Sequence, residues 1–566
     1  MSDLDAAIGS RLEAWTTDEV AGRLWARDGS LWGASGKPPD EIARWLGWLD
    51  LPAAMRARGP ELEHLARDVR EDGYRRAAVL GMGGSSLAPE LFSRVFGWAG
   101  GVEGSGAASP DGLELRILDS THPDAVRAFR SWASEQRTLF VVSSKSGTTT
   151  EPNAFQAAMA EIAPALDFIA ITDPDTPLAE LARAQEFRAI ITAPPDVGGR
   201  YSALSVFGLV PAALHGVPVG ALLARAERMA ADCREGDAAS NPGFCLGAFL
   251  GEAALAGRDK LTVLTGDRLA AFGDWAEQLV AESTGKAGTG IVPIVGEPLR
   301  DRDDYADDRC FVRIGMAGEH EPKLDRLTDD LESLGHPVMR VELADALDVG
   351  AEFMRWEVAT AAAGIVLGID PFDQPNVTES KDATSALLEA FRDRGALPQP
   401  MPLVSEPRVS VTADPETLGD ASVNVDGAVA QLLGLARPGI DYVAILAYVP
   451  KDPDIEGRLQ AIRARIGAAT GAATTLGFGP RFLHSTGQLH KGGPDTGVFL
   501  QLTAEPSKDL PIPGWDESFG TLIAAQALGD LASLQKRGRR ALRIHVNDLD
   551  AGLGRLEGVV GATISV

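Results

Sequence analysis

Cysteine is scarce in this sequence: Cys233, Cys245 and Cys310 are the three among 566 residues. They contain no CxxC pair, which excludes a disulfide framework and a zinc cluster of the usual spacing. The first segment, MSDLDAAIGSRLEAW, is acidic and lacks the apolar core of roughly 7 to 15 residues that a secretory signal requires. We therefore expect a protein of a reducing compartment, the cytoplasm.

Basic residues are also few relative to acidic ones. The sequence has 53 lysines and arginines against 80 acidic residues, which gives a formal net charge of −27. A surface of this sign repels nucleic acids and anionic lipid, so a role on either is not expected. No membrane span is expected, because the longest uncharged stretch, residues 201–224, is interrupted by Pro211 and Pro218. Any anionic ligand must bind in a local cationic pocket.

Apolar residues are plentiful, at 45% of the chain, and the length indicates several domains with large cores. From about residue 75 onward, short apolar runs such as TLFVV and FIAITD alternate with helical stretches. Runs that are apolar throughout are typical of parallel strands buried on both faces. The sequence thus predicts an α/β fold with parallel sheets.

The segments differ in composition, and four parts are predicted. They are a helical arm at 1–65, a first α/β domain at 66–222, a second α/β domain at 223–400, and a C-terminal α/β unit at 401–566. The last boundary falls within GALPQPMPLVSEP, whose prolines are typical of a linker.

A glycine cluster, GMGGSSLAPE at 81–90, follows the first predicted strand. Such a cluster lets backbone N–H groups approach a ligand closely. A dinucleotide fingerprint is disfavoured, because Ser86 stands where GxGxxG requires its third glycine, and this argues against an NAD-dependent oxidoreductase. A sugar or phosphate contact is favoured, and an ordinary tight turn is the alternative.

Hydroxyl residues crowd a second turn, SSKSGTTTEPNAF at 143–155, between a predicted strand and a predicted helix. The positive end of a helix and its free N–H donors favour an anion there. We predict a phosphate-binding loop without nucleotide or magnesium, since the order GxxxxGK[ST] is absent. The alternative is a capping turn in which Glu151 is the capping-box acid.

Two further segments carry ionisable groups. DVGGRYSALSVFG places Arg200 after two glycines, where it could stabilise an oxyanion, although a structural ion pair would also explain it. In GDWAEQLVAESTGKAGTG, Gln278 and Glu282 share one face of a predicted helix that ends near Gly285. Glu282 suits a general base, and a solvated helix-end glutamate is the alternative.

Read together with IDPFDQPNVTESK at 369–381, these motifs resemble the glucose-6-phosphate isomerase (phosphoglucose isomerase) family. The resemblance covers about residues 75 to 381. It implies that Glu282 is the proton-abstracting base, that Arg200 stabilises the enediolate, and that Lys381 takes part in ring opening. The substrate contacts that it implies are Gly84, Ser85, Ser144, Ser146, Thr148, Thr149, Gln278 and Gln374.

The family resemblance also implies the architecture and the activity. We expect two sugar-isomerase-type α/β/α sandwich domains, no cofactor, no metal, and a homodimer that binds a small sugar phosphate. The implied reaction interconverts glucose 6-phosphate and fructose 6-phosphate through an enediol, in glycolysis and gluconeogenesis. The alternatives are a broader isomerase that also takes mannose 6-phosphate and a non-catalytic sugar-phosphate-binding regulator.

The chain departs from the family at its histidine. The segment that follows the base motif contains no histidine, whereas RFLHSTGQLHKGG at 481–493 resembles the short bacterial form LHSMGQ. This predicts His484 as the catalytic histidine, with His490 as its rival and a structural role for both as the alternative. In this arrangement the chain is similar to the isomerase portion of bifunctional transaldolase/glucose-6-phosphate isomerase proteins.

Overall fold

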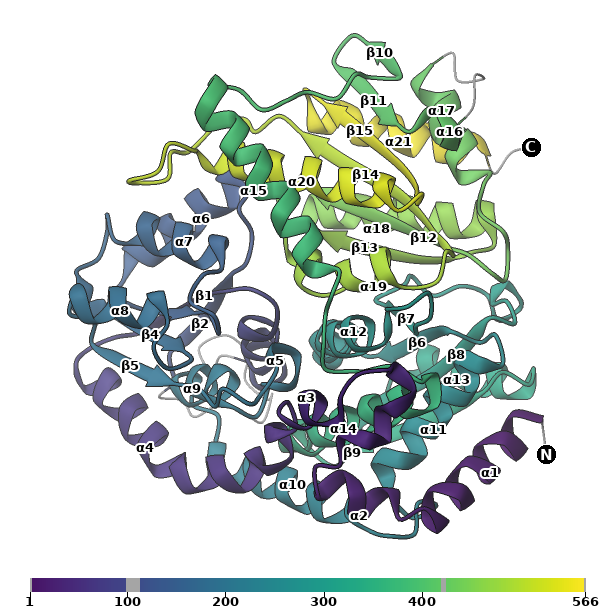
Figure 1. Cartoon of the computed structure of the whole chain (residues 1–566). Coiled ribbons are helices and arrows are strands. Elements are labelled where there is room, and N and C mark those ends of the chain that lie inside the picture. The colour runs from purple at the N-terminus through teal and green to yellow at the C-terminus, as the bar shows by residue number, and fades with distance from the viewer. Residues whose placement is uncertain (1–2, 98–111, 419–423, 564–566) are drawn as a thin grey trace. The chain divides into compact units, whose positions relative to one another are not determined.

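The computed structural model describes residues 3–97, 112–418 and 424–563, and the chain forms two compact units (Figure 1). Unit 1 consists of Met1–Asp119, Phe129–Thr284 and Cys310–Asp373. Unit 2 consists of Ser120–Ala128, Gly285–Arg309 and Gln374–Val566. Two of the points where the chain leaves unit 1, after Thr284 and after Asp373, lie inside motifs predicted to be functional.

The chain begins with helices, and no strand precedes Arg76 among the described residues. The helices are α1 (Asp3–Thr17), α2 (Val20–Trp25), α3 (Pro39–Ala43) and α4 (Leu51–Glu71). The ring of Trp15 in α1 packs against Phe244 with centroids 5.2 Å apart, so this helical arm is anchored to the rest of unit 1.

The first sheet of unit 1 has five parallel strands in the order β2-β1-β3-β4-β5. They are β1 (Arg76–Gly81), β2 (Glu114–Leu118), β3 (Thr138–Ser143), β4 (Phe168–Thr172) and β5 (Ala189–Thr192). The associated helices are α5 (Leu87–Phe96), α6 (Pro123–Glu135), α7 (Thr150–Met159), α8 (Pro177–Ala184) and α9 (Val206–His215). The strand order reverses between β1 and β3, which makes this pair the topological switch point of the sheet.

A second group of strands in unit 1 consists of β6 (Lys260–Thr265), β8 (Arg309–Met316) and β9 (Val338–Leu343), adjacent in that order. The helices with them are α10 (Val219–Asp232), α11 (Pro242–Leu255), α12 (Ala270–Thr284), α13 (Pro322–Ser333) and α14 (Val349–Leu367). Helices α11 and α14 pack closely because glycines at 243, 247 and 251 leave one face of α11 without side chains. A Cβ at Gly247 would lie 2.6 Å from the Cβ of Ala362.

Two glutamates of α14 are buried in the core of unit 1. Neither carboxyl oxygen of Glu357 has a hydrogen-bond partner among the described residues, and burial raises its pKa well above 4.5. Burial also raises the pKa of Glu352 to about 7, although Arg355, 3.3 Å away, opposes the shift. Both carboxyls therefore hold a proton at a pH at which they would lose it in the unfolded chain.

This burial predicts that the fold loses stability as the pH rises. A carboxyl whose pKa is higher in the folded state stabilises the fold most below the unfolded pKa, and that stability is lost as the pH rises through the folded pKa. For Glu352 the window runs from about pH 4.5 to about pH 7, and the loss is on the order of 3 kcal/mol. We expect Glu352→Gln and Glu357→Gln to reduce the difference between urea midpoints at pH 5 and pH 8. Glu63→Gln, on the exposed face of α4, should leave it unchanged.

Unit 2 is built on a six-stranded sheet in the order β10-β11-β15-β14-β12-β13. Its strands are β10 (Val404–Glu406), β11 (Val409–Ala413), β12 (Tyr442–Tyr448), β13 (Ala473–Phe478), β14 (Gly497–Ala504) and β15 (Arg540–Val546), and β7 (Val292–Val295) also belongs to this unit. Strands β12 to β15 are parallel, whereas β10 and β11 form an antiparallel edge that was not predicted.

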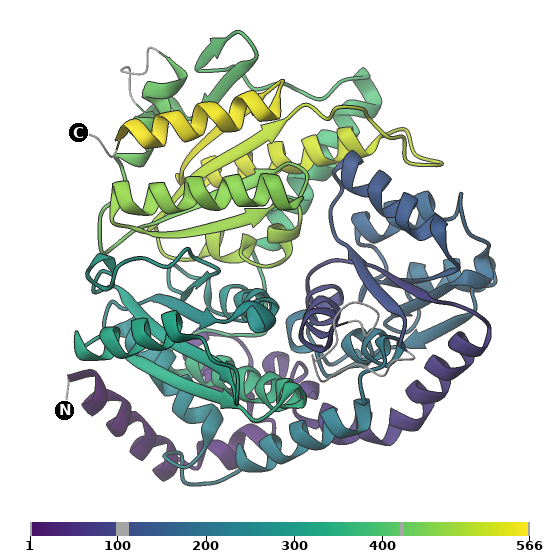
Figure 2. The same cartoon turned by 180° about the vertical axis from the view of Figure 1, so that it is seen from behind.

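Helices cover both faces of this sheet. α15 (Val377–Arg394) and α20 (Phe519–Lys536) pack together on one face, and α18 (Pro453–Thr470) and α21 (Leu549–Thr563) pack together on the other (Figures 1 and 2). The shorter helices are α16 (Pro415–Leu418), α17 (Val425–Leu433) and α19 (Gly487–Gly492). The predicted α/β fold with parallel sheets, a helical arm and a C-terminal α/β unit is confirmed.

The sequence predicts neither a membrane span nor a disulfide framework. None of the helices in the described ranges is long and apolar enough to cross a membrane. Each of the three cysteines is a thiol outside any disulfide: Cys233 and Cys310 are buried, and Cys245 is half-buried.

Candidate active site

Two loops predicted to contact the substrate follow the strands at the switch point of the first sheet. Gly81 at the end of β1 lies opposite Ser143 at the end of β3. This pairing places the glycine loop (residues 82–86) and the hydroxyl loop (residues 144–149) at the same edge of the sheet. In open α/β sheets, this is the edge at which ligands bind.

The hydroxyl loop presents its side chains ahead of helix α7. Ser146 and Thr148 are exposed, with hydroxyl oxygens 2.9 Å apart, and the buried Ser144 donates a hydrogen bond to Thr149 Oγ1 at 2.9 Å. Thr149 is the N-cap residue of α7, yet its side chain makes no capping bond. The first-turn N–H groups of α7 and the hydroxyls can therefore both serve an anion.

The glycine loop touches the segment that carries Arg200. A Cβ at Gly84 would lie 1.9 Å from the carbonyl oxygen of Gly199, so this approach requires glycine. Ser85, next to Gly84, is half-buried. The motifs at 81–90 and 194–208, far apart in the sequence, are thus in direct backbone contact.

The guanidinium of Arg200 is buried, with 3% of the residue exposed, and it joins three segments of unit 1. Its Nε donates to Ser283 Oγ at 2.7 Å. One terminal nitrogen donates to the carbonyl oxygens of Pro371 and Asp373 at 2.6 and 2.9 Å. The other terminal nitrogen lies 3.4 Å from Oε1 of Glu282. A planar fork with several donors is what such a position requires.

Glu282 lies in the last turn of α12 and is held on both sides. Its side chain is 12% exposed, with Oε1 facing Arg200. Its other oxygen, Oε2, accepts a hydrogen bond from Nε2 of Gln278, one turn earlier, at 3.2 Å. This geometry departs from the alternative of a solvated glutamate at a helix end. It leaves a partly exposed carboxylate, fixed in direction, beside a buried cation.

Three residues that the sequence reasoning missed support this cluster. Ser283, which bonds Arg200, stands inside the AESTGK motif and could have been suspected there. The hydroxyl of Tyr201 lies 3.4 Å from Ser283 Oγ, and burial raises the pKa of Tyr201. Lys37 of the helical arm forms ion pairs with Asp370 and Asp373 of the FDQ segment, and no local pattern marks it.

The remaining predicted site residues belong to unit 2. Gln374 is exposed just before α15, and Lys381 is exposed in α15 itself. His484 is half-buried at the end of the 3₁₀ turn Arg481–His484. Their parts in the reaction stay predictions that rest on the motifs.

The rival histidine, His490, has an apolar environment. Its ring lies 5.0 Å from that of Phe499, 6.0 Å from that of Phe482 and 6.3 Å from that of Tyr442, centroid to centroid. Its Nδ1 has no hydrogen-bond partner among the described residues. Burial lowers the pKa of His490 well below 6.5. These surroundings favour a packing role for His490.

Gln488, in the same LHSTGQLHKGG segment, joins three motif segments within unit 2. It is fully buried, and its Nε2 donates to Gly285 O at 2.9 Å and to Asn376 Oδ1 at 2.7 Å. Its Oε1 accepts from the N–H of Asn376 at 2.8 Å. A Cβ at Gly492 would meet the same groups, 2.4 Å from Asn376 Oδ1, so glycine is required there. We call this set of contacts the Gln488 clasp.

Removing the Gln488 side chain should loosen two motifs at once. Gln488→Ala leaves three polar groups of the clasp without partners, at about 1–3 kcal/mol for each that stays buried. We expect a lower urea midpoint. We also expect the kcat of the isomerisation that the motifs predict to fall at least about tenfold, because Gly285 follows Glu282 by three residues and its displacement would shift that carboxylate. Steady-state kinetics and urea unfolding of the same sample would check this. Gln535→Ala, on α20, is the control, and a kcat equal to that of the control would contradict a positioning role.

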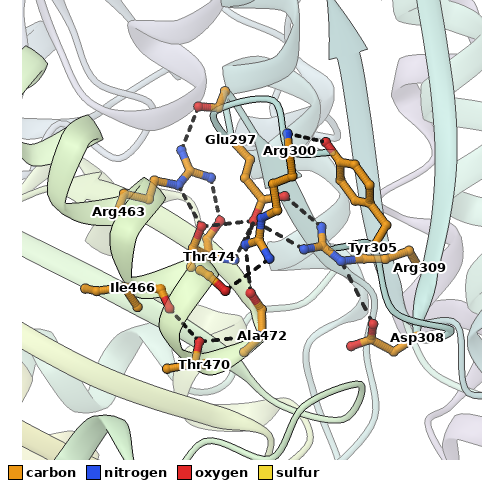
Figure 3. Close-up of polar contacts among 12 residues, drawn as sticks. Glu297, Arg300, Tyr305, Asp308, Arg309, Arg463, Ile466, Thr470, Ala472 and Thr474 are labelled. Carbon is orange, nitrogen blue, oxygen red and sulfur yellow. Dashed lines mark hydrogen bonds and ion pairs between the residues drawn. The ribbon is translucent and has the colours of Figure 1, made fainter. Parts of the chain in front are cut away.

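The segment after Gly285 is fixed in unit 2 by a buried ionic network around Glu297 (Figure 3). Arg309 and Arg300 bond the Glu297 carboxylate at 3.0 and 2.7 Å, and the Thr474 N–H donates to it at 2.8 Å. Burial alone would raise the pKa of Glu297, but the nearby arginines hold it at about 2. Arg463 adds bonds to the carbonyl oxygens of residues 295 and 296. The network attaches residues 295–309 to α18 and β13.

Comparison with known proteins supports the family resemblance that the motifs indicated. No model of a known protein family matches the chain. A glucose-6-phosphate isomerase of Rubrobacter xylanophilus is 28% identical over 419 residues, covering 66% of this chain and 93% of the relative. One of Carboxydothermus hydrogenoformans is 27% identical over 404 residues, covering 62% and 86%. This chain resembles the glucose-6-phosphate isomerase family.

Solved structures agree with this resemblance at the level of the fold. A glucose-6-phosphate isomerase from Chlamydia trachomatis superposes with a TM-score of 0.53 at 18% identity, covering 69% of this chain and 87% of the other. A hypothetical protein from Thermus thermophilus gives a TM-score of 0.54 at 22% identity, covering 66% and 97%. The resemblance to glucose-6-phosphate isomerases that the motifs predicted is confirmed.

Proposed function

We propose that this protein is a glucose-6-phosphate isomerase, which interconverts glucose 6-phosphate and fructose 6-phosphate through an enediol. The observation that carries the proposal is the contact between Glu282 and Arg200, 3.4 Å apart in unit 1. A base next to a cation is what proton abstraction beside a carbonyl group requires. The named relatives support the choice of substrate.

The hydroxyl loop would bind the phosphate of the sugar. Its exposed hydroxyls, Ser146 and Thr148, and the N-terminus of α7 offer hydrogen-bond donors to a dianion. Binding energy gained at this remote group can hold the reacting carbons in place.

Glu282 would carry out both proton transfers. In the open-chain aldose, it takes the proton from carbon 2, and the electron pair forms the double bond between carbons 1 and 2. The carbonyl oxygen on carbon 1 gains negative charge, which Arg200 stabilises. Glu282 then returns the proton to carbon 1, the hydroxyl proton on carbon 2 passes to the oxygen on carbon 1, and the ketone forms at carbon 2. Atoms and electrons balance without a cofactor.

Ring opening precedes this step and needs separate groups. By the resemblance, Lys381 and His484 would move the proton between the ring oxygen and the hydroxyl of carbon 1, and Gln374 would contact the sugar. A homodimer and a cytoplasmic location are part of the same proposal. They rest on the family and on the scarcity of cysteine, respectively.

A coupled assay tests the proposal. Purified protein is incubated with fructose 6-phosphate, without metal or nucleotide, and the glucose 6-phosphate formed is then measured by adding a reporter dehydrogenase together with its nicotinamide cofactor. Formation of glucose 6-phosphate is expected. Binding of fructose 6-phosphate in calorimetry without any turnover would instead identify a non-catalytic regulator, and turnover of mannose 6-phosphate would identify the broader isomerase.

A further inference from the structure

The most basic stretch of this acidic chain lies outside the sequence motifs described above. Residues 536–540 read KRGRR, four cations in five positions of a chain whose net charge is −27. They form the turn between α20 and β15, and Gly538 takes a φ of 67° to make that turn. Concentrating positive charge in one turn creates a local field that the rest of the surface opposes.

This turn borders a cleft of about 630 Å³ within unit 2. The residues that line the cleft are Gly288, Glu379, Lys491, Gly492, Gly493, Asp495, Lys536, Arg537 and Arg539. Three glycines form part of the wall, and the side chains that face the space are four basic ones and two acidic ones. None of the residues assigned to the isomerase reaction is among them. We propose that this cleft is a second binding site, for a small polyanion such as a compound with two or more phosphate or carboxylate groups.

The cations of the cleft differ in how firmly they are held. Arg539 is buried, and its guanidinium donates to the carbonyl oxygens of Lys491 and Gly493 at 3.0 and 2.6 Å. Its other terminal nitrogen pairs with the exposed Asp495 at 3.1 Å. Arg539 is thus a cation fixed in place in the lining of the cleft, which costs a ligand no ordering of that side chain.

The other two cations are adaptable. Arg537 pairs with Glu379, and both side chains are about one-third exposed. Lys536 is exposed and has no ion-pair partner in the part of the chain that the structure describes. Exposed ion pairs contribute only about 0–1 kcal/mol, so a ligand with several negative charges can take Arg537 from Glu379. Lys491 adds little charge, because it is buried in a pair with Asp530 at 2.7 Å.

Size and lining restrict the chemistry of the ligand. The volume lies within the range of about 300–1,000 Å³ that is typical of small-molecule sites. No aromatic or aliphatic residue is among those that line the cleft. A nucleobase or other aryl group would find nothing on which to stack. A compact polyanion matches both the charge and the absence of apolar lining.

Helix electrostatics are the alternative explanation for the basic turn. Cations in the last turn of a helix interact favourably with its negative end, and α20 ends at Lys536. This accounts for Lys536 and Arg537 without any ligand. It does not account for Arg539, which lies beyond the helix and contributes to the cleft together with the glycine wall.

Calorimetric titration of the full chain with inorganic pyrophosphate tests the site. Wild type is compared with Lys536→Gln/Arg537→Gln and with the control Lys323→Gln/Arg326→Gln, two exposed cations of α13 that lose the same charge. Any pyrophosphate bound at the hydroxyl loop is common to all three proteins. The cleft variant should lose one binding event or weaken it at least about tenfold, while the control stays within about twofold of wild type.

Glu379→Gln adds a gain of affinity that misfolding cannot mimic. It removes the competitor of the ligand for Arg537, so pyrophosphate should bind more tightly than to wild type. Identical titrations of all four proteins, or binding only at tens of millimolar, would overturn the site and leave an adventitious ion only. Isomerase activity is measured on the same samples and should be unchanged in the cleft variant. If wild type turns over fructose 6-phosphate but binds no pyrophosphate that the cleft variant loses, this inference alone is rejected.

Discussion

Replacing Glu282 with glutamine is expected to lower kcat for fructose 6-phosphate by about 10²- to 10⁴-fold. The amide keeps the size of the side chain and can still hydrogen bond to Gln278, but it cannot take a proton from carbon. KM should change little, because the hydroxyl loop that we propose binds the phosphate is untouched. The coupled assay gives kcat and KM, and the urea midpoint of the variant shows that it is folded.

The matched control is Glu180→Gln on the exposed side of α8, in the same unit. It removes one carboxylate and should leave kcat within about twofold of wild type. If Glu282→Gln keeps near-normal turnover while its unfolding curve is unchanged, the assignment of the base is wrong. The proposed mechanism would then have no proton acceptor beside Arg200.

Arg200 is expected to give the second-largest effect. Removing one donor to a developing oxyanion commonly costs about 10²- to 10³-fold in kcat. Arg200→Ala would also strand the carbonyl oxygens of Pro371 and Asp373, so it can fail to fold. Arg200→Lys keeps the charge but loses the fork that bonds Ser283 and the two carbonyls together. We expect Arg200→Lys to fold and to lose most of its kcat.

The kinetic pattern separates a role in the reaction from a structural one. If Arg200 stabilises the enediolate, kcat falls while KM for fructose 6-phosphate is nearly constant. Arg183→Lys, an exposed arginine of α8, is the control and should match wild type. A drop in urea midpoint with unchanged kcat would show that Arg200 only holds the segments together.

Much of the fold could be predicted from local patterns. The continuous apolar runs of β1, β3 and β4 indicated parallel strands buried on both faces, and all three are buried throughout. The antiparallel edge of β10 and β11 could not be predicted, because it depends on β11 pairing with β15, more than a hundred residues away. Short edge strands carry weak sequence signals.

The contacts of the candidate site were likewise predictable only in part. Glu282 and Gln278 were linked by helical spacing, and their contact is found. Lys37 and Ser283 were not predicted, since their partners Asp373 and Arg200 are remote in sequence and only the packed fold brings them together. The same holds for Gln488, whose three hydrogen bonds reach residues 285 and 376. Buried polar networks of this kind have no period and no fixed spacing.

The reactivity of the three thiols can report whether the protein is folded. Cys245 is half-buried and Cys233 is buried, and burial raises the pKa of both thiols, to about 12 for Cys233. A thiol reagent should therefore modify Cys245 faster than the other two cysteines, which react only as the core opens. Each variant above can be checked in this way before its kinetics are interpreted.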